Sequence, residues 1–382
     1  MKAIGIIAEY NPFTNGHFYH IQKIKEMYPE HTIVVVMNGH FTERGNVSII
    51  DKWKRTEIAL QMGADLVVEL PFPFATQSAD FFAYGAITIL EKLKVEKVIF
   101  GSESDNLEDL KLIAKAQINN DELDKLVKVY SRFGNNYPTA LSNAIMDLTG
   151  KKIDAPNDLL GISYIKTILK NNYSIKPEII KRTNNYHEKE LKLDGSATSI
   201  REALKKNQDV HGYIPDIELP YLNQLHFLED YFPLIKYKII TEEDLSIYQT
   251  VEEGIEFKLK KEIINSTSME DFISKIKSKR YTYNKITRML IHILCNFTKE
   301  KAKSMKEIEY IRILGLNNIG KKYLNTIKKE LDVPLISKIT REKKKMLEYE
   351  LETTKIYDIP TNDNLNKKEY DKIIDMGGSK DD

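Results

Sequence analysis

The chain has 382 residues, of which 42% are hydrophobic and 30% are charged, so it can bury a substantial core and is long enough for two domains. A formal net charge of +1 excludes a global positive field, so a polyanionic partner must be met by local basic patches. The single cysteine, Cys295, excludes a disulfide framework, and no apolar run approaches the roughly 20 residues of a membrane span. With no secretory signal pattern at the start, we expect a cytoplasmic protein without membrane contact.

Strand and helix patterns alternate through the first 210 residues. Apolar and β-branched runs predict strands at 2–8, 32–37, 66–70, 97–100 and 179–181. Amphipathic spacing predicts helices at 16–27, 51–62 and 78–93, with more helix from 107 to about 173 and a helix start at 199–206. Strands that alternate with helices form parallel units, so we predict an α/β domain over residues 1–210, built on a doubly wound parallel sheet.

The character of the chain changes after residue 210. Long apolar periodicities predict helices at 242–262, 269–277 and 282–303. A small mixed segment follows at 310–314, 320–331 and 334–336. We therefore predict a second, mainly α-helical domain over residues 211–376, followed by a disordered tail at 377–382 (GGSKDD).

A phosphate-binding loop is predicted after the first strand, where residues 14–17 (TNGH) precede a helix. Gly16 lets the backbone approach a phosphate closely, and the helix start presents free N–H groups and a positive dipole end. His17 can donate a hydrogen bond as charge develops on a phosphate oxygen, and His20 lies on the same helix face one turn later. The alternative is an Asn-Gly turn that caps an ordinary helix.

A second anion-binding element is predicted at 196–201 (SATSIR), after the last strand of the same sheet. Ser196 and Thr198 supply hydroxyl donors at a helix start, and Arg201 adds a guanidinium suited to bidentate phosphate contact. The alternative is again a helix cap, with Thr198 or Ser199 paired to Glu202. In a doubly wound sheet the loops at the carboxyl ends of the strands meet over one crevice, so the two elements together suit a triphosphate.

The order of a strand, T-x-G-H, a helix and S-x-T-x-I-R resembles the nucleotidylyltransferase superfamily, with its motifs HxGH and ISSTxxR. Thr14 stands in place of the first histidine, which weakens one phosphate contact and argues against a standard cytidylyl or pantetheine-phosphate enzyme. Longer runs closely resemble the tRNA(Met) cytidine acetate ligase family over nearly the whole chain. These runs are 7–20 (IAEYNPFTNGHFYH), 37–39 (MNG), 51–55 (DKWKR), 63–71 (GADLVVELP), 100–103 (FGSE), 156–158 (PND) and 310–315 (YIRILG).

This resemblance implies a Rossmann-like nucleotidylyltransferase fold and a reaction in two steps. ATP activates acetate as acetyl-adenylate with release of pyrophosphate, and the acetyl group passes to N4 of the wobble cytidine (C34) of elongator tRNA(Met), giving N4-acetylcytidine. Mg²⁺ is expected with the nucleotide. The resemblance places ATP contacts at Ile7, Ala8, Glu9, Tyr10, Asn11, Pro12, Phe13, Thr14, Asn15, Gly16, His17, Phe18, Tyr19, His20, Gly101, Asn157, Arg182, Ser196, Thr198 and Arg201.

Catalytic roles are expected at Thr14, His17 and Arg201, and no dedicated metal cluster is expected. Attack by a carboxylate on the α-phosphorus needs positioning and charge neutralisation more than a protein nucleophile. We expect His17 to stabilise the α-phosphate and the 196–201 element to bind the β- and γ-phosphates. Apart from the resemblance, Gly101, Asn157 and Arg182 are also explained by a strand-end turn, a helix cap and a solvated charge, respectively.

Several basic residues are candidates for tRNA contact. Lys52, Lys54 and Arg55 can meet phosphates of tRNA or of ATP, and they surround the only tryptophan, which serves either as a stacking platform or as core. Three more basic residues border a predicted helix of the second domain: Arg280, Lys285 and Arg288. Lysine-rich helix faces in so charged a chain are often only solvated.

Two other functions fit parts of this pattern. A small-molecule nucleotidylyltransferase that adenylylates a phosphorylated metabolite explains the first domain but leaves the second without a task. A catalytically inactive RNA-binding protein with a relic nucleotide fold explains the second domain, but His17 and Arg201 are intact.

Overall fold

A computed structural model describes residues 1–118, 120–135, 137–152, 155–182, 196–371 and 373–377. The described strands form one sheet in the order β5-β4-β1-β2-β3-β6-β7, and β8 pairs with β6. They are β1 (Ala3–Ala8), β2 (Thr32–Asn38), β3 (Leu66–Leu70), β4 (Lys97–Ser102), β5 (Lys176–Lys181), β6 (Ile311–Leu316), β7 (Leu335–Ile336) and β8 (Ile374–Asp375). The first five strands are parallel, which confirms the predicted sheet.

The order in which strands are added to the sheet reverses beside β1. From β1 it proceeds to β2 and β3 on one side, and then returns to β4 and β5 on the other. In parallel sheets of this kind, ligands bind beyond the carboxyl ends of the strands at this switch point. The topology therefore points to the gap between β1 and β4.

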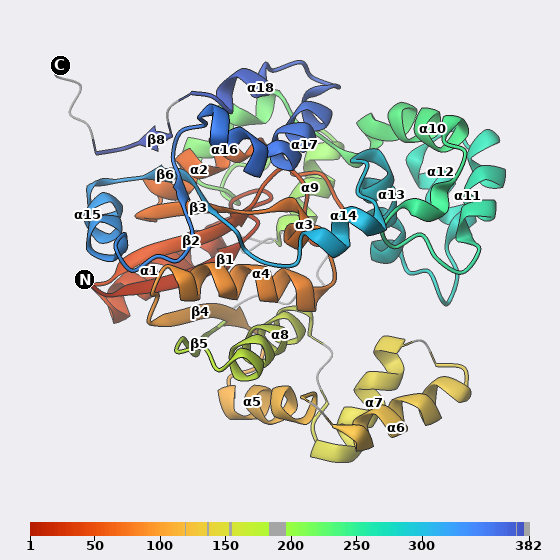
Figure 1. The fold of residues 1–382 in the computed structure, drawn as a ribbon, viewed down its shortest axis with the longest axis horizontal. Coiled ribbons are helices and arrows are strands. Elements are labelled where there is room, and N and C mark those ends of the chain that lie inside the picture. The colour runs from red at the N-terminus through yellow and green to blue at the C-terminus, as the bar shows by residue number, and fades with distance from the viewer. Residues whose placement is uncertain (119, 136, 153–154, 183–195, 372, 378–382) are drawn as a thin grey trace.

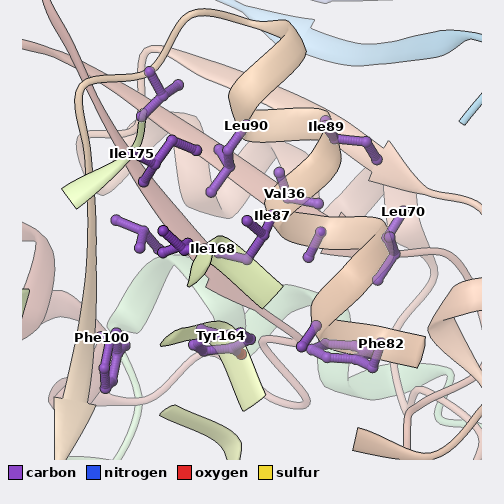
Figure 2. Packing of buried hydrophobic residues seen from close by; sticks show 14 of the residues in the cluster. Val36, Leu70, Phe82, Ile87, Ile89, Leu90, Phe100, Tyr164, Ile168 and Ile175 are labelled. Carbon is purple, nitrogen blue, oxygen red and sulfur yellow. The ribbon is translucent and has the colours of Figure 1, made fainter. Parts of the chain in front are cut away.

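Helices cover both faces of the sheet (Figure 1). The helices of this first part of the chain are α1 (Asn15–Met27), α2 (Lys52–Gln61), α3 (Phe72–Ala75), α4 (Ala79–Lys92), α5 (Leu107–Ala116), α6 (Asp121–Arg132), α7 (Tyr137–Thr149), α8 (Pro156–Asn171) and α9 (Ala197–Lys205), of which α6 and α7 form a pair away from the sheet. Successive side chains of a strand face opposite sides, so Val34 and Val36 join one core cluster and Val35 joins another. The first cluster packs against α4 and α8, where Leu90, Ile168 and Tyr164 lie (Figure 2).

A helical group lies to one side of the sheet (Figure 1), and its apolar core also includes Phe41, Val47 and Phe72 from the first part of the chain. Its helices are α10 (Phe232–Thr241), α11 (Ile255–Ile264), α12 (Met269–Ile276), α13 (Tyr283–Leu294) and α14 (Lys299–Ser304). The chain then continues through α15 (Asn318–Ile327), α16 (Arg341–Met346), α17 (Glu348–Asp358) and α18 (Leu365–Lys368). The prediction of a second, mainly helical part is confirmed.

Two predicted helices differ from the structure. Residues 242–254 contain only a short 3-10 turn, because Thr250, Glu253 and Gly254 adopt positive φ, and α11 begins at Ile255. The predicted helix 282–303 is two helices, since Asn296 also has a positive φ between α13 and α14.

The C-terminal segment returns to the first part of the chain. β6 pairs antiparallel with β3, so the sheet contains residues from both sides of the predicted boundary at 210. That boundary stays a prediction. Of the predicted tail, 378–382 lies outside the described residues. Within the part of the chain described, no helix is both long and apolar enough to cross a membrane.

Candidate active site

A cavity of about 650 Å³ lies at the switch point, at the carboxyl ends of β1, β4 and β5. It brings together both predicted phosphate elements, which are about 180 residues apart in the sequence. The predicted ATP-site residues that line it are Ile7, Ala8, Glu9, Tyr10, Asn11, Thr14, Gly16, His17, Tyr19, His20, Gly101, Asn157, Arg182, Ser196, Thr198 and Arg201.

Four residues of the predicted run do not line the cavity: Pro12, Phe13, Asn15 and Phe18. Phe13 is fully buried in the core, and its N–H donates to Glu218. The side-chain amide of Asn15 donates to the Gly212 carbonyl, and Phe18 is exposed on α1. These side chains support the loop or face away from the cavity, so their direct contact with ATP stays a prediction.

Thr14 and His17 bind each other at the start of α1. Thr14 is the N-cap, and its hydroxyl accepts a hydrogen bond from the His17 N–H at 3.3 Å. In return, the Thr14 N–H donates to Nδ1 of His17 at 2.9 Å. Because Nδ1 accepts, the ring proton of the neutral imidazole is on Nε2. Thr14 therefore fixes the tautomer of His17.

His17 stays neutral over the physiological pH range. Burial is the main cause, and together with the charges of Arg182 and His20 it lowers the pKa of His17 to about 3. The rings of Tyr10 and Phe13 lie edge-on to the imidazole, with centroids at 5.0 and 5.6 Å. The residue can thus offer one N–H donor from a rigid, uncharged ring.

Two arginines hold the loop that follows β1. Nη1 of Arg201 donates to the Asn11 carbonyl at 2.5 Å, while Nη2 donates to the Thr198 hydroxyl at 3.1 Å. On the other side, Nη1 of Arg55 donates to the Glu9 carbonyl at 2.6 Å. Arg201 thereby connects the second predicted phosphate element to the loop that leads into the first.

The start of α9 faces the cavity. Ser196 is its N-cap and accepts from the Ser199 N–H at 3.2 Å, so the cap is neither Thr198 nor Ser199. Thr198, one turn from Arg201, lines the cavity. The cap at Ser196 is therefore compatible with anion binding at this helix start, which stays a prediction.

Replacing Arg201 by lysine is expected to raise the KM for ATP about tenfold. The single ammonium of lysine cannot bridge Asn11 and Thr198 as the guanidinium does. The size of the effect follows from the loss of a hydrogen bond from a charged donor, which contributes about 1.5–3 kcal/mol. The measurement is pyrophosphate exchange at varied ATP, with acetate as the carboxylate that the resemblance implies. Lys206→Arg, at the exposed end of the same helix, is the matched control. An unchanged KM for ATP would contradict the role of Arg201.

The opposite wall of the cavity contains Gly101, Asn157 and Arg182. A Cβ at Gly101 would lie 3.2 Å from Cγ of Arg182, so the glycine leaves room for that arginine. Asn157 is not a helix cap, since Ala155 is the N-cap of α8. The side-chain amide of Asn157 donates to Glu103 at 2.5 Å.

Two buried nitrogen atoms, Nε of Arg182 and Nε2 of His20, have no hydrogen-bond partner among the described residues. Both atoms are therefore suited to binding a polar ligand.

The cavity has a third wall that the sequence reasoning did not identify. It consists of Thr42, Glu43, Arg44 and Asn46 after β2, Ala79 and Phe82 at the start of α4, Tyr164 on α8 and Asn284 on α13. In a parallel sheet, the loops that follow β2 and β3 lie at the same edge as the loop that follows β1. This rule could have predicted from the sequence that residues after β2 and β3 line the cavity.

The prediction that Lys52 and Arg55 contact tRNA is wrong, because both side chains are fully buried. Lys52 lies 2.7 Å from Glu69 and 2.8 Å from Glu369. Arg55 binds backbone carbonyls, including those of Glu9 and Ile50. Trp53, only 7% exposed, belongs to the core. Lys54 remains partly exposed, 3.5 Å from Asp51.

The predicted basic residues of the second part differ in exposure. The Arg280 side chain is 70% exposed and pairs with Glu253 at 2.7 Å. Lys285 is partly exposed, with its ammonium over the Tyr281 ring. Arg288 is largely covered and pairs with Glu43 at 2.9 Å. Arg280 and Lys285 therefore remain available to a polyanion, whereas Arg288 serves a contact within the protein.

A parallel sheet of this topology, with two predicted anion-binding helix starts over one cavity, is typical of a nucleotidyl transferase. Consistent with this, residues 1–372 match the model of the HIGH Nucleotidyl Transferase family. The chain is 41% identical to a tRNA(Met) cytidine acetate ligase of Anoxybacillus flavithermus, covering 88% of this chain and 89% of that protein. It is 38% identical to the enzyme of that name from Geobacillus sp., covering 97% and 98%.

Solved structures agree with these sequence matches. The apo form of Thermotoga maritima TmcAL superimposes with a TM-score of 0.92 at 27% identity, covering 99% of this chain and all of that one. A second crystal form of TmcAL, bound with alpha-thio ATP, gives a TM-score of 0.90 at 28% identity. The chain belongs to the tRNA(Met) cytidine acetate ligase family.

Proposed function

We propose that the protein is an ATP-dependent acetate ligase that acetylates N4 of the wobble cytidine of elongator tRNA(Met). The observation that carries this proposal is the neutral His17 N–H at a cavity joined by Arg201 to a second anion-binding helix start, in a chain of this family. A relative bound with alpha-thio ATP supports ATP as the nucleotide. A role in tRNA modification also supports a cytoplasmic location.

In the first step, an oxygen of acetate attacks the α-phosphorus of ATP, and pyrophosphate leaves. We propose that Nε2–H of His17 stabilises the charge that develops on the α-phosphate. Arg201, Ser196 and Thr198 bind the β- and γ-phosphates, and Arg182 uses its buried N–H on the nucleotide. The loop held by Arg55 and Arg201 supplies a preorganised backbone around these groups.

We propose that Mg²⁺ accompanies the phosphates of ATP, because a divalent cation neutralises the charge of the leaving pyrophosphate. Mg²⁺ prefers oxygen ligands and usually retains water, and it commonly uses one or two carboxylates together with phosphates. The carboxylate of Glu9 and the hydroxyl of Thr198 line the cavity and fit this preference.

We propose that the exposed face beside α13 binds the tRNA through Arg280 and Lys285. Replacing both by alanine is expected to weaken tRNA binding and to reduce the slope of log Kd against log salt by about one to two units. Acetate activation should persist. Lys23→Ala, on the exposed face of α1, is the matched control. An unchanged salt slope in the double variant would remove this face from the interface.

The function is tested by nucleoside mass spectrometry of tRNA incubated with the protein, ATP and isotope-labelled acetate. The expected product is N4-acetylcytidine that carries the label, with pyrophosphate release that depends on acetate. Release that requires a phosphorylated metabolite instead would replace this proposal by a small-molecule nucleotidylyltransferase. Tight tRNA binding without turnover would indicate an inactive RNA-binding protein.

A further inference from the structure

The cavity has a nucleotide side and a second side without an assigned ligand. The predicted ATP residues lie on the loops after β1, β4 and β5 and at the start of α9. The second side is formed by the loop 42–46 after β2, the start of α4, and Asn284 from α13. With the nucleotide at its proposed place, the switch point between β1 and β4, this second side is where another substrate can approach it.

Glu43 is the acidic side chain of the loop 42–46, and its position is fixed from several directions. Its backbone N–H donates to Oε1 of Glu9 at 2.7 Å. Its Oε1 accepts from Nη1 of Arg288 at 2.9 Å. Its Oε2 lies 4.0 Å from Nε of Arg44. A carboxylate is thus held at the wall of a cavity whose other side is the proposed phosphate site.

The loop is tightly joined to α13 of the helical group. The hydroxyl of Thr287 donates to the Arg44 carbonyl at 2.6 Å. Gly45 has a φ of +73°, and a Cβ there would lie 2.2 Å from the backbone nitrogen of Arg288. Arg288 also donates to the Gln77 carbonyl at 3.1 Å. The helix that borders the proposed tRNA face therefore sets the position of Glu43 in the cavity.

The electrostatic surroundings suit a proton acceptor. Burial raises the pKa of Glu43; Arg288 opposes this rise and Glu9 adds to it. Burial also raises the pKa of the Tyr164 phenol, and the charges of Glu9 and Glu43 add to that effect. A carboxylate with a raised pKa is a stronger base at neutral pH than an exposed one.

Cytosine has the chemistry that a carboxylate recognises. Its N4 amine donates hydrogen bonds, and acidic side chains accept from it. Uracil presents an oxygen at that position, which a carboxylate repels. A base that reacts inside the cavity must also leave its stack, and the loop after β2 and the start of α4 lie at the cavity wall, where they can receive it.

We propose that the side of the cavity formed by the loop 42–46 and Asn284 receives the acceptor cytosine, and that Glu43 is the base that takes its N4 proton. This inference rests on the proposed function. N4 attacks the carbonyl carbon of acetyl-adenylate, the bond from that carbon to the phosphate oxygen breaks, and AMP leaves with the electron pair. The proton of N4 passes to the carboxylate of Glu43 and then to water. Arg288 is a positioning residue for Glu43.

Glu43→Gln tests this assignment in the full chain, because glutamine preserves the oxygen that accepts from Arg288 but removes the base. Preformed acetyl-adenylate is mixed with tRNA, and N4-acetylcytidine is followed by mass spectrometry in a single turnover. Acetyl transfer is expected to fall about 100-fold, within the usual range for general base catalysis. Glu43→Asp should recover part of the rate. Glu252→Gln, an exposed carboxylate of the helical group, is the matched control.

Acetate-dependent pyrophosphate exchange in the same variant separates the two steps and reports on folding. Exchange within about threefold of the parent, together with the slow transfer, supports the proposal. Parental transfer by Glu43→Gln overturns it. Loss of exchange to the same extent as transfer also overturns it, since Glu43 would then act in activation. If the parent protein leaves tRNA unmodified, the proposed function itself fails.

Discussion

Replacing His17 by alanine is expected to lower acetate-dependent pyrophosphate exchange about 100- to 1000-fold while the fold is retained. This is the usual cost of removing one preorganised donor from a developing anion. The donor is Nε2–H of a neutral ring, because Nδ1 accepts from the Thr14 N–H. With a pKa of about 3, the ring keeps this form at the pH of the assay.

The pH dependence separates this role from a protonated one. An imidazolium would be lost as the pH rises through the ordinary histidine value of 6.5, and activation would fall with it. With the lowered pKa, no such loss attributable to His17 is expected between pH 5 and 9. His31→Ala, beyond the far end of α1, is the control. Parental exchange in the His17 variant would remove the residue from the mechanism.

The β1–α1 segment shows what local sequence can predict. The strand is a continuous buried run, the helix has its N-cap at Thr14, and the loop between them has a recognisable motif. Each signal depends on residues close in sequence, so both the fold and the phosphate site could be predicted there. The pairing of Thr14 with His17 depends on side-chain geometry and was not predictable from the motif alone.

Contacts between distant segments account for what was missed. β6 lies in the sheet because it pairs with β3, more than 240 residues earlier, and no local pattern records that partner. Glu43 was missed as a cavity residue because its position depends on α13, which meets the loop 42–46 only in the folded chain. Lysine and arginine normally lie at the surface, which made the burial of Lys52 and Arg55 unexpected.

Lys52→Ala is expected to lower the free energy of unfolding by about 3–5 kcal/mol, because removing one partner leaves a buried charge uncompensated. Lys52 and Arg312 face Glu69 and Glu369 in a group of two positive and two negative side chains, all nearly fully buried. Urea unfolding followed by circular dichroism measures the loss. Lys54→Ala, beside it on α2 and partly exposed, is expected to cost less than about 1 kcal/mol.

The balance of buried charges, rather than the lost side-chain volume, should determine how far the free energy of unfolding falls. Lys52→Met with Glu69→Gln restores equal numbers of positive and negative groups, so the double variant should be more stable than Lys52→Met alone. Burial tends to raise the pKa of Glu369, but Lys52 and Arg312 outweigh it and the net shift is downward. Its stabilisation is therefore present above the ordinary value of 4.5 and is lost as the pH falls below it. Without Lys52, the loss of unfolding free energy at acid pH should become smaller. An unchanged pH dependence, together with a small decrease in the free energy of unfolding, would mean that Arg312 alone neutralises both carboxylates.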